Sequence, residues 1–337
     1  IHQRHSIKKT LRVQIKRSYD ESRANFHRQG RQNKQKRFCK RVVVMSTFDT
    51  DIKLVADKTD QYLKSYFSQQ KQNNELFEAM GYGLFAGGKK IRSYLTVAAF
   101  DLFDIKEETA IAVAAAIECV HSYSLIHDDL PSMDNDDFRR GKESTHKKFG
   151  ESTAILAGNS LLTIAFEILT SNHLNLDKEV KSDLVFALAS CSGHLGIAGG
   201  QFLDLSFEGK AQDEKTIIHM QNKKTGELMG FCTEAAAIVA KKNNDREELK
   251  KIGLDIGLLF QIADDLLDVY GDQNKLGKPS KQDDKKGKAT LIATLGLDKT
   301  NALANELHDK IKHSLEKYGT KANRLLSSAE FILKRDH

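Results

Sequence analysis

Apolar residues recur every three to four positions along most of the chain beyond residue 50, which places them on one face of successive helices. The pattern predicts helices over 52–67, 94–103, 110–126, 152–169, 184–197, 217–240 and 252–269, followed by two or three shorter helices. The alternation typical of strands is absent. The sequence therefore predicts an all-α, single-domain helical bundle covering residues 45–337.

Two segments interrupt this helical pattern. Residues 84–92 contain Gly87 and Gly88 and predict a hinge that opens the helix running through Phe103. Residues 271–287 are charged, contain three glycines and Pro279, and predict a mobile loop. Both segments carry lysines, which gain importance once the acidic residues are considered.

Composition supports a helical protein, because the chain has only 2 prolines and no tryptophan. No uninterrupted apolar run reaches the roughly 18–20 residues that cross a membrane, so no membrane span is expected. Of the four cysteines, Cys39 precedes the helical region, while Cys119, Cys191 and Cys232 stand alone without metal-binding spacing. They predict reduced, buried thiols in a cytoplasmic protein.

The net charge of +6 is unevenly distributed. Residues 1–44 hold 14 Lys and Arg against two acids and contribute +12, which leaves −6 for the rest. We interpret 1–44 as a leader, tag remnant or translated upstream sequence that is foreign to the fold. A transit peptide is the alternative, although three serines are few for one, and nucleic-acid binding through this arm is disfavoured.

The strongest chemical signal is a pair of aspartate-rich motifs about 135 residues apart. In the second motif, Gln261, Asp264, Asp265 and Asp268 fall at i, i+3, i+4 and i+7, along one face of a helix. Apolar residues occupy the remaining surface of that helix. Burying three acids is costly unless something neutralises them, which disfavours an ordinary solvated acidic face.

The first motif follows the same logic. His121, Ser124 and Asp128 lie on one face of an otherwise apolar helix that stops near Pro131. Further acids follow at once, among them Asp134, and they could form a surface salt-bridge cluster. Their place at the end of a buried helix instead indicates the rim of a cavity. Oxygen ligands in this number suit Mg²⁺, which binds through a few carboxylates together with substrate phosphates.

Basic residues accompany both motifs. Singly, each lysine or arginine is more often a solvated surface residue than a ligand. As a set they indicate phosphate binding, with one anion held through Mg²⁺ and carboxylates and another held directly. The set is Lys89, Arg92, Arg139, Arg140, Lys224, Lys278 and Lys288.

Five motifs together resemble the trans-isoprenyl diphosphate synthase family, and within it the bacterial-type farnesyl diphosphate synthases. They are Gly-Gly-Lys-Lys-Ile-Arg at 87–92, the run 121–141 around Asp-Asp-Leu-Pro-Ser-Met-Asp, Lys-Thr-Gly-Glu-Leu at 224–228, Phe-Gln-Ile-Ala-Asp-Asp-Leu-Leu-Asp at 260–268 and Gly-Lys-Ala-Thr at 287–290. The resemblance runs from about residue 50 to the end of the chain.

The resemblance implies a helical bundle around a deep central cavity, usually a homodimer, that condenses isopentenyl diphosphate with dimethylallyl or geranyl diphosphate. It implies three Mg²⁺ ions on Asp128, Asp134, Asp264 and Asp268, supported by Asp129 and Asp265. The allylic diphosphate would be held by Arg139, Lys224, Thr225, Gln261, Lys278 and Lys288, and isopentenyl diphosphate by Lys89, Arg92, His121 and Arg140. Lys224 and Thr225 would also stabilise the cation through their carbonyl groups.

Two positions depart from the family pattern. Ser93 stands where proline is usual, and Lys281 stands where glycine is usual. Both lie near predicted phosphate ligands without being ligands themselves. We therefore expect altered affinity rather than lost activity.

Product length would be set by the residues that precede the first motif. Tyr123 and Ser124 lie five and four positions before Asp128, and a bulky aromatic side chain there would stop the growing tail. The resemblance then indicates a C15 product, farnesyl diphosphate. Tyr123 as an ordinary core residue, and a C20 product, geranylgeranyl diphosphate, are the alternatives.

Three other interpretations agree less well with the motifs. A class I terpene cyclase would normally carry Asn, Ser or Thr with Glu in its second motif, whereas three aspartates stand here. A non-catalytic partner subunit would tend to lose motif aspartates, and both motifs are complete. A generic acidic helical interaction protein leaves the buried acids unexplained.

Overall fold

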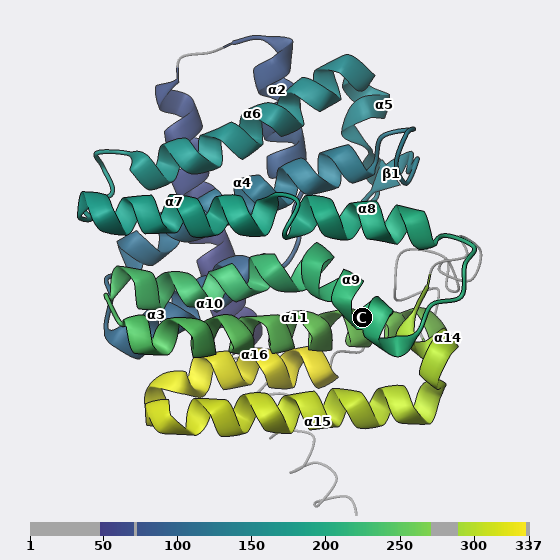
Figure 1. Cartoon of the computed structure of the whole chain (residues 1–337). Helices are drawn as coiled ribbons and strands as arrows, with labels where there is room; N and C mark the ends of the chain where they lie inside the picture. The colour runs from purple at the N-terminus through teal and green to yellow at the C-terminus, as the bar shows by residue number, and fades with distance from the viewer. Residues whose placement is uncertain (1–47, 71–72, 271–288, 335–337) are drawn as a thin grey trace, which may run out of the picture. The chain divides into compact units, whose positions relative to one another are not determined.

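The computed structural model describes residues 48–70, 73–270 and 289–334 (Figure 1). The chain divides into two compact units, 1–51 and 52–337, and most of the second unit is described. The predicted leader 1–44, with Cys39, lies outside the described residues, and its separation from the helical domain remains a prediction. The predicted loop 271–287 and the residues Lys278, Lys281 and Lys288 also lie outside them.

Described residues of the second unit are almost entirely helical, which confirms the predicted all-α class. A first helix covers 48–69. It is followed by α2 (Glu75–Leu84), α3 (Ile91–Phe100), α4 (Glu107–Asp128), α5 (Thr145–Phe149), α6 (Glu151–Thr170), α7 (Lys178–Ser192), α8 (Ile197–Phe207), α9 (Glu214–Gln221), α10 (Glu227–Val239), α11 (Asn243–Tyr270), α14 (Leu291–Leu295), α15 (Leu297–Leu315) and α16 (Asn323–Lys334). Short 3₁₀ turns cover Asp101–Phe103 and Glu316–Ala322.

Helix α4 lies at the centre of this bundle. It packs against α3 on one side and α6 on another, while α10 joins α3 to α11. Helices α15 and α16 pack against α11, and α7 and α8 lie nearly end to end across the middle of the view in Figure 1. The run from Val113 to Ile117 in α4 is fully buried, and its three alanines allow neighbouring helices to approach closely.

Two described helices, α4 and α6, are long and apolar enough to cross a membrane by length and composition alone. No membrane span was expected from the sequence, because Glu118 and His121 interrupt the apolar run of α4. In α4, 83% of the most apolar window is buried inside the fold, as in a core helix of a globular protein. In α6 the corresponding share is 39%, so much of its apolar surface faces outwards.

A small hairpin follows the first motif, although no strand was predicted. Strands β1 (Phe138–Arg139) and β2 (Lys142–Glu143) pair antiparallel. Arg140 and Gly141 connect them with φ of 52° and 74°. Positive φ at both central residues is the requirement of a tight hairpin turn whose twist matches that of the strands. The hairpin fixes the positions of Arg139 and Arg140, which are predicted substrate ligands.

Two predicted helices are each broken in the structure. The helix expected over 184–197 ends at Ser192, and α8 begins at Ile197 after a short turn. A Cβ atom on Gly196 would lie 1.9 Å from the Cys191 carbonyl oxygen, so only glycine fits this turn. The helix expected over 217–240 is interrupted by a π-helical turn at Asn222–Gly226. Such turns disturb the regular hydrogen-bond ladder and occur often at functional sites.

Candidate active site

The first aspartate motif is formed where α4 ends. Proline at 131 cannot continue a helix, and the chain folds back so that the Asp134 amide donates to the Asp128 carbonyl oxygen at 2.8 Å. This return places the two carboxyl groups near each other. Burial raises the pKa of the Asp128 carboxyl to about 6, with Lys224 acting against this effect and Asp134 adding to it.

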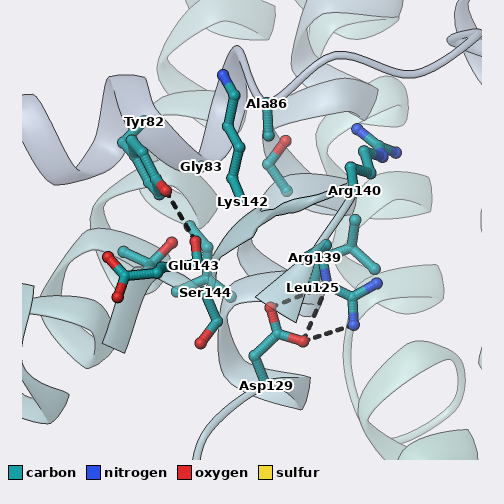
Figure 2. Close-up of a pocket in the computed structure, with 13 residues that line it drawn as sticks. Tyr82, Gly83, Ala86, Leu125, Asp129, Arg139, Arg140, Lys142, Glu143 and Ser144 are labelled. Atoms are coloured by element: carbon teal, nitrogen blue, oxygen red, sulfur yellow. Dashed lines mark hydrogen bonds and ion pairs between the residues drawn. The ribbon is translucent and has the colours of Figure 1, made fainter. Parts of the chain in front are cut away.

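The second acid of the motif holds an arginine from the hairpin. Asp129 is 2% exposed, and its carboxylate accepts hydrogen bonds from Arg139 Nε at 2.9 and 2.8 Å and from Nη2 at 2.5 Å (Figure 2). A forked pair of this kind fixes both the position and the orientation of the guanidinium. Asp129, predicted as a supporting metal residue, is therefore turned towards Arg139 in this structure.

A pocket lies beside this ion pair, between α2, α4 and the hairpin (Figure 2). The Tyr82 hydroxyl donates to the Glu143 carbonyl oxygen at 2.8 Å and ties α2 to β2 across one side of the pocket. Arg140 and Lys142 also line it. The pocket thus borders the first motif from the hairpin side and is part of the same region.

The second half of the site forms at the π-helical turn. Lys224 Nζ pairs with Asp204 Oδ2 of α8 at 2.5 Å, and Thr225 Oγ1 donates to Gln261 Oε1 of α11. The helix α8 comes very close to this turn, since a Cβ atom on Gly200 would lie 2.2 Å from the Lys224 backbone nitrogen. The turn therefore connects α8 to the helix that carries the second motif.

The second motif occupies the predicted face of α11. Asp265 is 8% exposed, and Asp264, Asp268 and Gln261 are partly buried, so the motif is not an ordinary solvated acidic face. The charge of Asp264 acts on Arg92 of α3. Since Lys224 acts on Asp128, and Thr225 bonds Gln261 of α11, the structure brings both motifs near Arg92 and Lys224.

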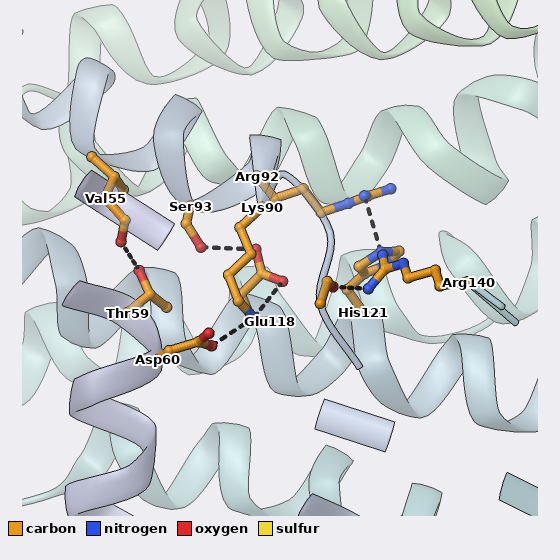
Figure 3. Close-up of polar contacts among 10 residues, drawn as sticks. Val55, Thr59, Asp60, Lys90, Arg92, Ser93, Glu118, His121 and Arg140 are labelled. Atoms are coloured by element: carbon orange, nitrogen blue, oxygen red, sulfur yellow. Dashed lines mark hydrogen bonds and ion pairs between the residues drawn. The ribbon is translucent and has the colours of Figure 1, made fainter. Parts of the chain in front are cut away.

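A cationic group lies where α3 begins, next to α4. Arg92 Nη1 and His121 Nε2 are 3.4 Å apart, and Arg140 donates to the Gly87 carbonyl oxygen (Figure 3). Burial, with the nearby charges of Arg92 and Arg140, lowers the pKa of His121 well below 6.5, so its imidazole is neutral near pH 7. A neutral imidazole can accept a hydrogen bond from Arg92 and add none of its own positive charge.

Glycine is required in the loop before α3. Gly88 has a φ of 109°, and a Cβ atom there would lie 2.6 Å from the Arg140 guanidinium carbon. The exposed Lys89 that follows lies over the Phe331 ring of α16, with its Nζ 4.9 Å from the ring centroid. Arg92, His121 and Arg140 thus gather at the start of α3, whereas Lys89 of the same segment lies against Phe331 of α16.

The two residues proposed to limit product length are both buried. The Tyr123 hydroxyl donates to the Ser192 carbonyl oxygen at 3.3 Å, and Ser124 Oγ donates to the His121 carbonyl oxygen at 2.9 Å. Burial, together with the charge of Asp128, raises the pKa of Tyr123 to about 12, so the hydroxyl keeps its proton. Its ring also meets His127 edge to face at 5.6 Å.

The aspartates suit a divalent cation by their chemistry, although they are not gathered in advance. Among the described residues, no group of three or more His, Cys, Asp or Glu side chains is close enough to hold a metal ion. The donor set consists of carboxylates, which Mg²⁺ prefers. The raised pKa of Asp128 shows that its buried negative charge lacks full compensation, which a cation would supply.

Three functional candidates were missed in the sequence. Asp204 holds Lys224, and Gln201 is 4% exposed with neither side-chain amide atom hydrogen-bonded in the described structure. The sequence did contain a sign of this pair, because Gln201 and Asp204 are three positions apart on an otherwise apolar helix and follow two glycines. Glu118, an acid inside the buried helix α4, carried the same kind of signal.

Acidic motifs at the end of α4 and on α11, with lysine and arginine held beside them in an all-α bundle, suit an enzyme that handles diphosphates. The chain belongs to the polyprenyl synthetase family, whose model matches residues 73–326. This confirms the family predicted from the five motifs and the expectation that the protein is an enzyme.

Individual relatives agree with this assignment. The chain is 40% identical to farnesyl diphosphate synthase of Escherichia coli (strain K12) over 271 residues, which cover 79% of this chain and 91% of that protein. It is 39% identical to a chloroplastic geranylgeranyl pyrophosphate synthase of Catharanthus roseus over 268 residues, 78% and 74% of the two chains. An FPP/GFPP synthase from Zymomonas mobilis superposes with a TM-score of 0.75 at 41% identity, covering 85% and 99%.

Proposed function

We propose that this enzyme condenses isopentenyl diphosphate with dimethylallyl or geranyl diphosphate to give farnesyl diphosphate. The observation that carries the proposal is the convergence of both motif helices on the π-helical turn. Thr225 bonds Gln261 of α11, and Lys224 acts electrostatically on Asp128 of α4. A site of this kind can hold an anionic leaving group between carboxylate-bound cations and fixed positive side chains.

The allylic diphosphate would bind at the π-helical turn and the first motif. Asp204 orients the Lys224 ammonium, and Asp129 orients the Arg139 guanidinium. Both cations are therefore preorganised before the substrate arrives, which lowers the reorganisation needed during the reaction. Lys278 and Lys288 are proposed as further ligands and lie outside the described residues.

Reaction would begin when the C–O bond of the allylic substrate breaks and its electron pair leaves with the diphosphate. The π electrons of isopentenyl diphosphate then form the new C–C bond to the allylic cation, and a proton is lost to give the product double bond. We propose the released diphosphate as the proton acceptor. The carbonyl groups of Lys224 and Thr225, and a cavity that excludes water, would protect the cation.

Magnesium is the proposed cofactor, as three ions with the bound diphosphate. When bound, Mg²⁺ would neutralise charge on the departing diphosphate. Asp128, Asp134, Asp264 and Asp268 are the proposed ligands, with Asp129 and Asp265 in support. In the protein itself, the partly buried Asp128 and the Arg139–Asp129 pair determine where such charge can be placed.

Isopentenyl diphosphate would bind at the cationic group of Lys89, Arg92, His121 and Arg140. The close contact of Arg92 with neutral His121 leaves the guanidinium as the main charge on α3. Arg140 is held in place by the Gly87 carbonyl oxygen. The two substrates would thus meet across the helix end that carries Asp128.

The test of this function is an assay with Mg²⁺, isopentenyl diphosphate and labelled dimethylallyl or geranyl diphosphate, followed by product-length analysis. A Mg²⁺-dependent C15 product supports the proposal, and a C20 product keeps the class but changes the product. Cyclic or hydrolysed products would favour a terpene cyclase. No turnover in this assay would favour a partner subunit.

Product length is proposed to be limited by Tyr123. Its hydroxyl is fixed to Ser192 at the end of α7 and its ring to His127, so the side chain cannot swing aside without losing both contacts. Such a fixed ring makes a firm floor for a growing prenyl tail. The near-equal identities to C15 and C20 synthases mean that overall similarity does not decide the product length.

Replacing Tyr123 with Ala should shift the product from C15 towards C20, because the floor is removed. Product chromatography measures the shift. Tyr123→Phe, which keeps the ring and loses only the bond to Ser192, is the matched control and should retain a C15 product. An unchanged C15 product from Tyr123→Ala would contradict the floor assignment.

We further propose a cytoplasmic homodimer. Large apolar side chains are exposed on three successive helices: Ile155 and Leu156 on α6, Phe186 on α7, and Leu195 and Phe202 just before and within α8. Large apolar side chains exposed on neighbouring helices are typical of an association surface. Sedimentation should give twice the chain mass of 37.8 kDa. A monomeric mass at micromolar concentration would remove the dimer from the proposal.

A further inference from the structure

A buried polar cluster lies directly beneath the Gly87–Arg92 segment (Figure 3). Lys90 Nζ lies 3.2 Å from Asp60 Oδ1 and 3.7 Å from Glu118 Oε2, and Ser93 Oγ donates to Glu118 Oε1 at 2.8 Å. The contact with Asp60 is at ion-pair distance but is not aligned as a hydrogen bond. We call these four residues the Lys90 cluster.

Three members of the Lys90 cluster are enclosed by the protein, and the fourth, Asp60, is partly exposed. The side chains of Lys90 and Glu118 are 4% and 5% exposed, and Ser93 is fully buried. Lysine is rarely buried unless it is paired, because removing its charge from water is costly. Lys90 points towards Glu118 and Asp60, whereas Arg92 and Arg140 extend towards His121 (Figure 3). Lys90 therefore faces away from the group proposed to bind isopentenyl diphosphate.

The cluster also explains an unusual backbone conformation. Lys90 has a φ of 48° and a ψ of 50°, a left-handed conformation that residues with a Cβ atom seldom adopt. Lys90 is the residue directly before α3. The exposed Lys89 precedes it, and Arg92 comes two residues after it. Such strain persists only where surrounding contacts impose it. The two ion pairs supply those contacts and hold the side chain of Lys90 inwards.

Glu118 links this cluster to the other proposed ligands. It lies three residues before His121 on α4, one helical turn away, and its charge acts on both Arg92 and Arg140. The cluster thus connects the first helix, the start of α3 and the middle of α4. Any shift of Lys90 would move Lys89 and Arg92 relative to His121.

We propose that Lys90, Ser93 and Glu118 are positioning residues that set the Gly87–Arg92 segment in the conformation that binds isopentenyl diphosphate. None of the three touches the substrate, and Lys90 acts through Glu118 and Asp60. The inference rests on the proposed function, because it concerns the same substrate site.

Ser93 has a defined part in this arrangement. Its hydroxyl occupies one carboxylate oxygen of Glu118 and leaves the other for Lys90. Proline, which the resemblance leads one to expect at this position, has no group that could donate this bond. The departure at position 93 therefore adds a polar contact that belongs to this chain.

The test compares Michaelis constants for the two substrates. Lys90→Met should raise the KM for isopentenyl diphosphate by about tenfold and leave the KM for geranyl diphosphate within about twofold, since a small displacement of ligands weakens one site selectively. Lys90→Arg should restore most of the affinity, because arginine can form the same ion pairs. Calorimetric binding of isopentenyl diphosphate alone should show the same order.

Two further variants provide a control and a milder change for this experiment. Lys58→Met removes the exposed ion pair with Glu107, which joins the same two helices as the Asp60 and Glu118 contacts, and should leave both Michaelis constants unchanged. Ser93→Ala removes only one hydroxyl and should raise the KM for isopentenyl diphosphate about two- to fourfold. If Lys90→Met does not fold, Ser93→Ala and Lys90→Arg carry the test.

A double-variant cycle separates positioning from direct contact with substrate. If Lys90 acts through Glu118, Lys90→Met combined with Glu118→Gln should bind isopentenyl diphosphate no worse than the weaker single variant. Additive losses would mean that Lys90 binds the diphosphate itself and would overturn the proposal. Lower unfolding midpoints with unchanged Michaelis constants would overturn it as well. Should the unmodified chain form no condensation product, the proposed function fails, and the inference fails with it.

Discussion

Helix α4 carries two acids, Glu118 and Asp128, whose environments are opposite. Glu118 is enclosed in the middle of the helix and meets Lys90 and Ser93, so its charge is compensated within the protein. Asp128, at the end of the helix, is partly buried, and this burial raises its pKa to about 6, with Lys224 opposing the shift and Asp134 adding to it. One acid is paired in advance, and the other is held with its charge incompletely compensated.

This difference distinguishes residues that position a site from residues that bind a ligand. A compensated buried pair contributes to a defined conformation, and breaking it destabilises the fold. An uncompensated buried charge lowers stability and persists where function requires it. The distinction would be contradicted if removing the charge of Asp128 lowered the stability of the fold, or if removing that of Glu118 did not.

The largest expected effect is on turnover. Asp128→Asn should lower kcat/KM by about 10²–10³-fold, because a neutral amide cannot hold the cation that faces the departing diphosphate. Steady-state kinetics at saturating Mg²⁺ measures the loss. Circular dichroism should show an unchanged helical content, which separates a catalytic effect from misfolding. A loss of less than about fivefold would remove Asp128 from the metal site.

The second effect is on stability and should follow Glu118. Glu118→Gln should lower the free energy of unfolding by about 2 kcal/mol. The loss is smaller than for a buried lysine that loses its only ion-pair partner, because Asp60 still faces Lys90. Urea titration followed by circular dichroism measures it. The isosteric Glu107→Gln, at an exposed ion pair of the same helix, is the control and should change stability by less than about 0.5 kcal/mol.

The pH dependence of stability should sharpen the contrast at Asp128. Its folded-state pKa of about 6 lies above the ordinary value of 3.8, so the folded state binds this proton more tightly. Its contribution is therefore most favourable below pH 4 and is lost as pH rises through 6. At pH 7, the free energy of unfolding of Asp128→Asn should exceed that of the unmodified chain by roughly 2–3 kcal/mol.

Urea titrations of both chains at pH 4 and pH 7 measure this difference. The two chains should be nearly equal in stability at the lower pH, where Asp128 is protonated, and should diverge at the higher one. Equal stabilities at both values would show that the charge of Asp128 is already compensated in the protein. In that case the contrast with Glu118 would disappear.

Helix positions could be predicted where one periodic pattern determined them. The runs 110–126 and 152–169 became α4 and α6, because packing and propensity agree there. The interruptions could not be predicted in the same way. The π-helical turn at Asn222–Gly226 depends on the close approach of α8 at Gly200, a contact between segments distant in sequence. The hairpin at 138–143 depends on a turn that two residues with positive φ create.

In the site, too, the features that follow from a local sequence pattern could be predicted, and those that depend on tertiary contacts could not. The aspartates could be proposed from the sequence, because acids on apolar helices are costly without a partner. Which carboxylate pairs with which cation was not identifiable, since the pairing of Asp129 with Arg139 and of Glu118 with Lys90 depends on tertiary geometry. Asp129 shows the consequence, because a residue placed in the metal set by its motif holds an arginine here.

The smallest expected effect concerns Asp204, which is intermediate between the two acids of α4. It pairs with Lys224 as Glu118 pairs with Lys90, yet its partner is a proposed substrate ligand. Asp204→Asn should raise the KM for geranyl diphosphate about three- to tenfold and leave that for isopentenyl diphosphate unchanged, because the Lys224 ammonium loses its orientation. Asp204→Glu, which keeps the charge, should recover part of the affinity. Equal changes in both Michaelis constants would mean that Asp204 stabilises the whole site rather than one cation.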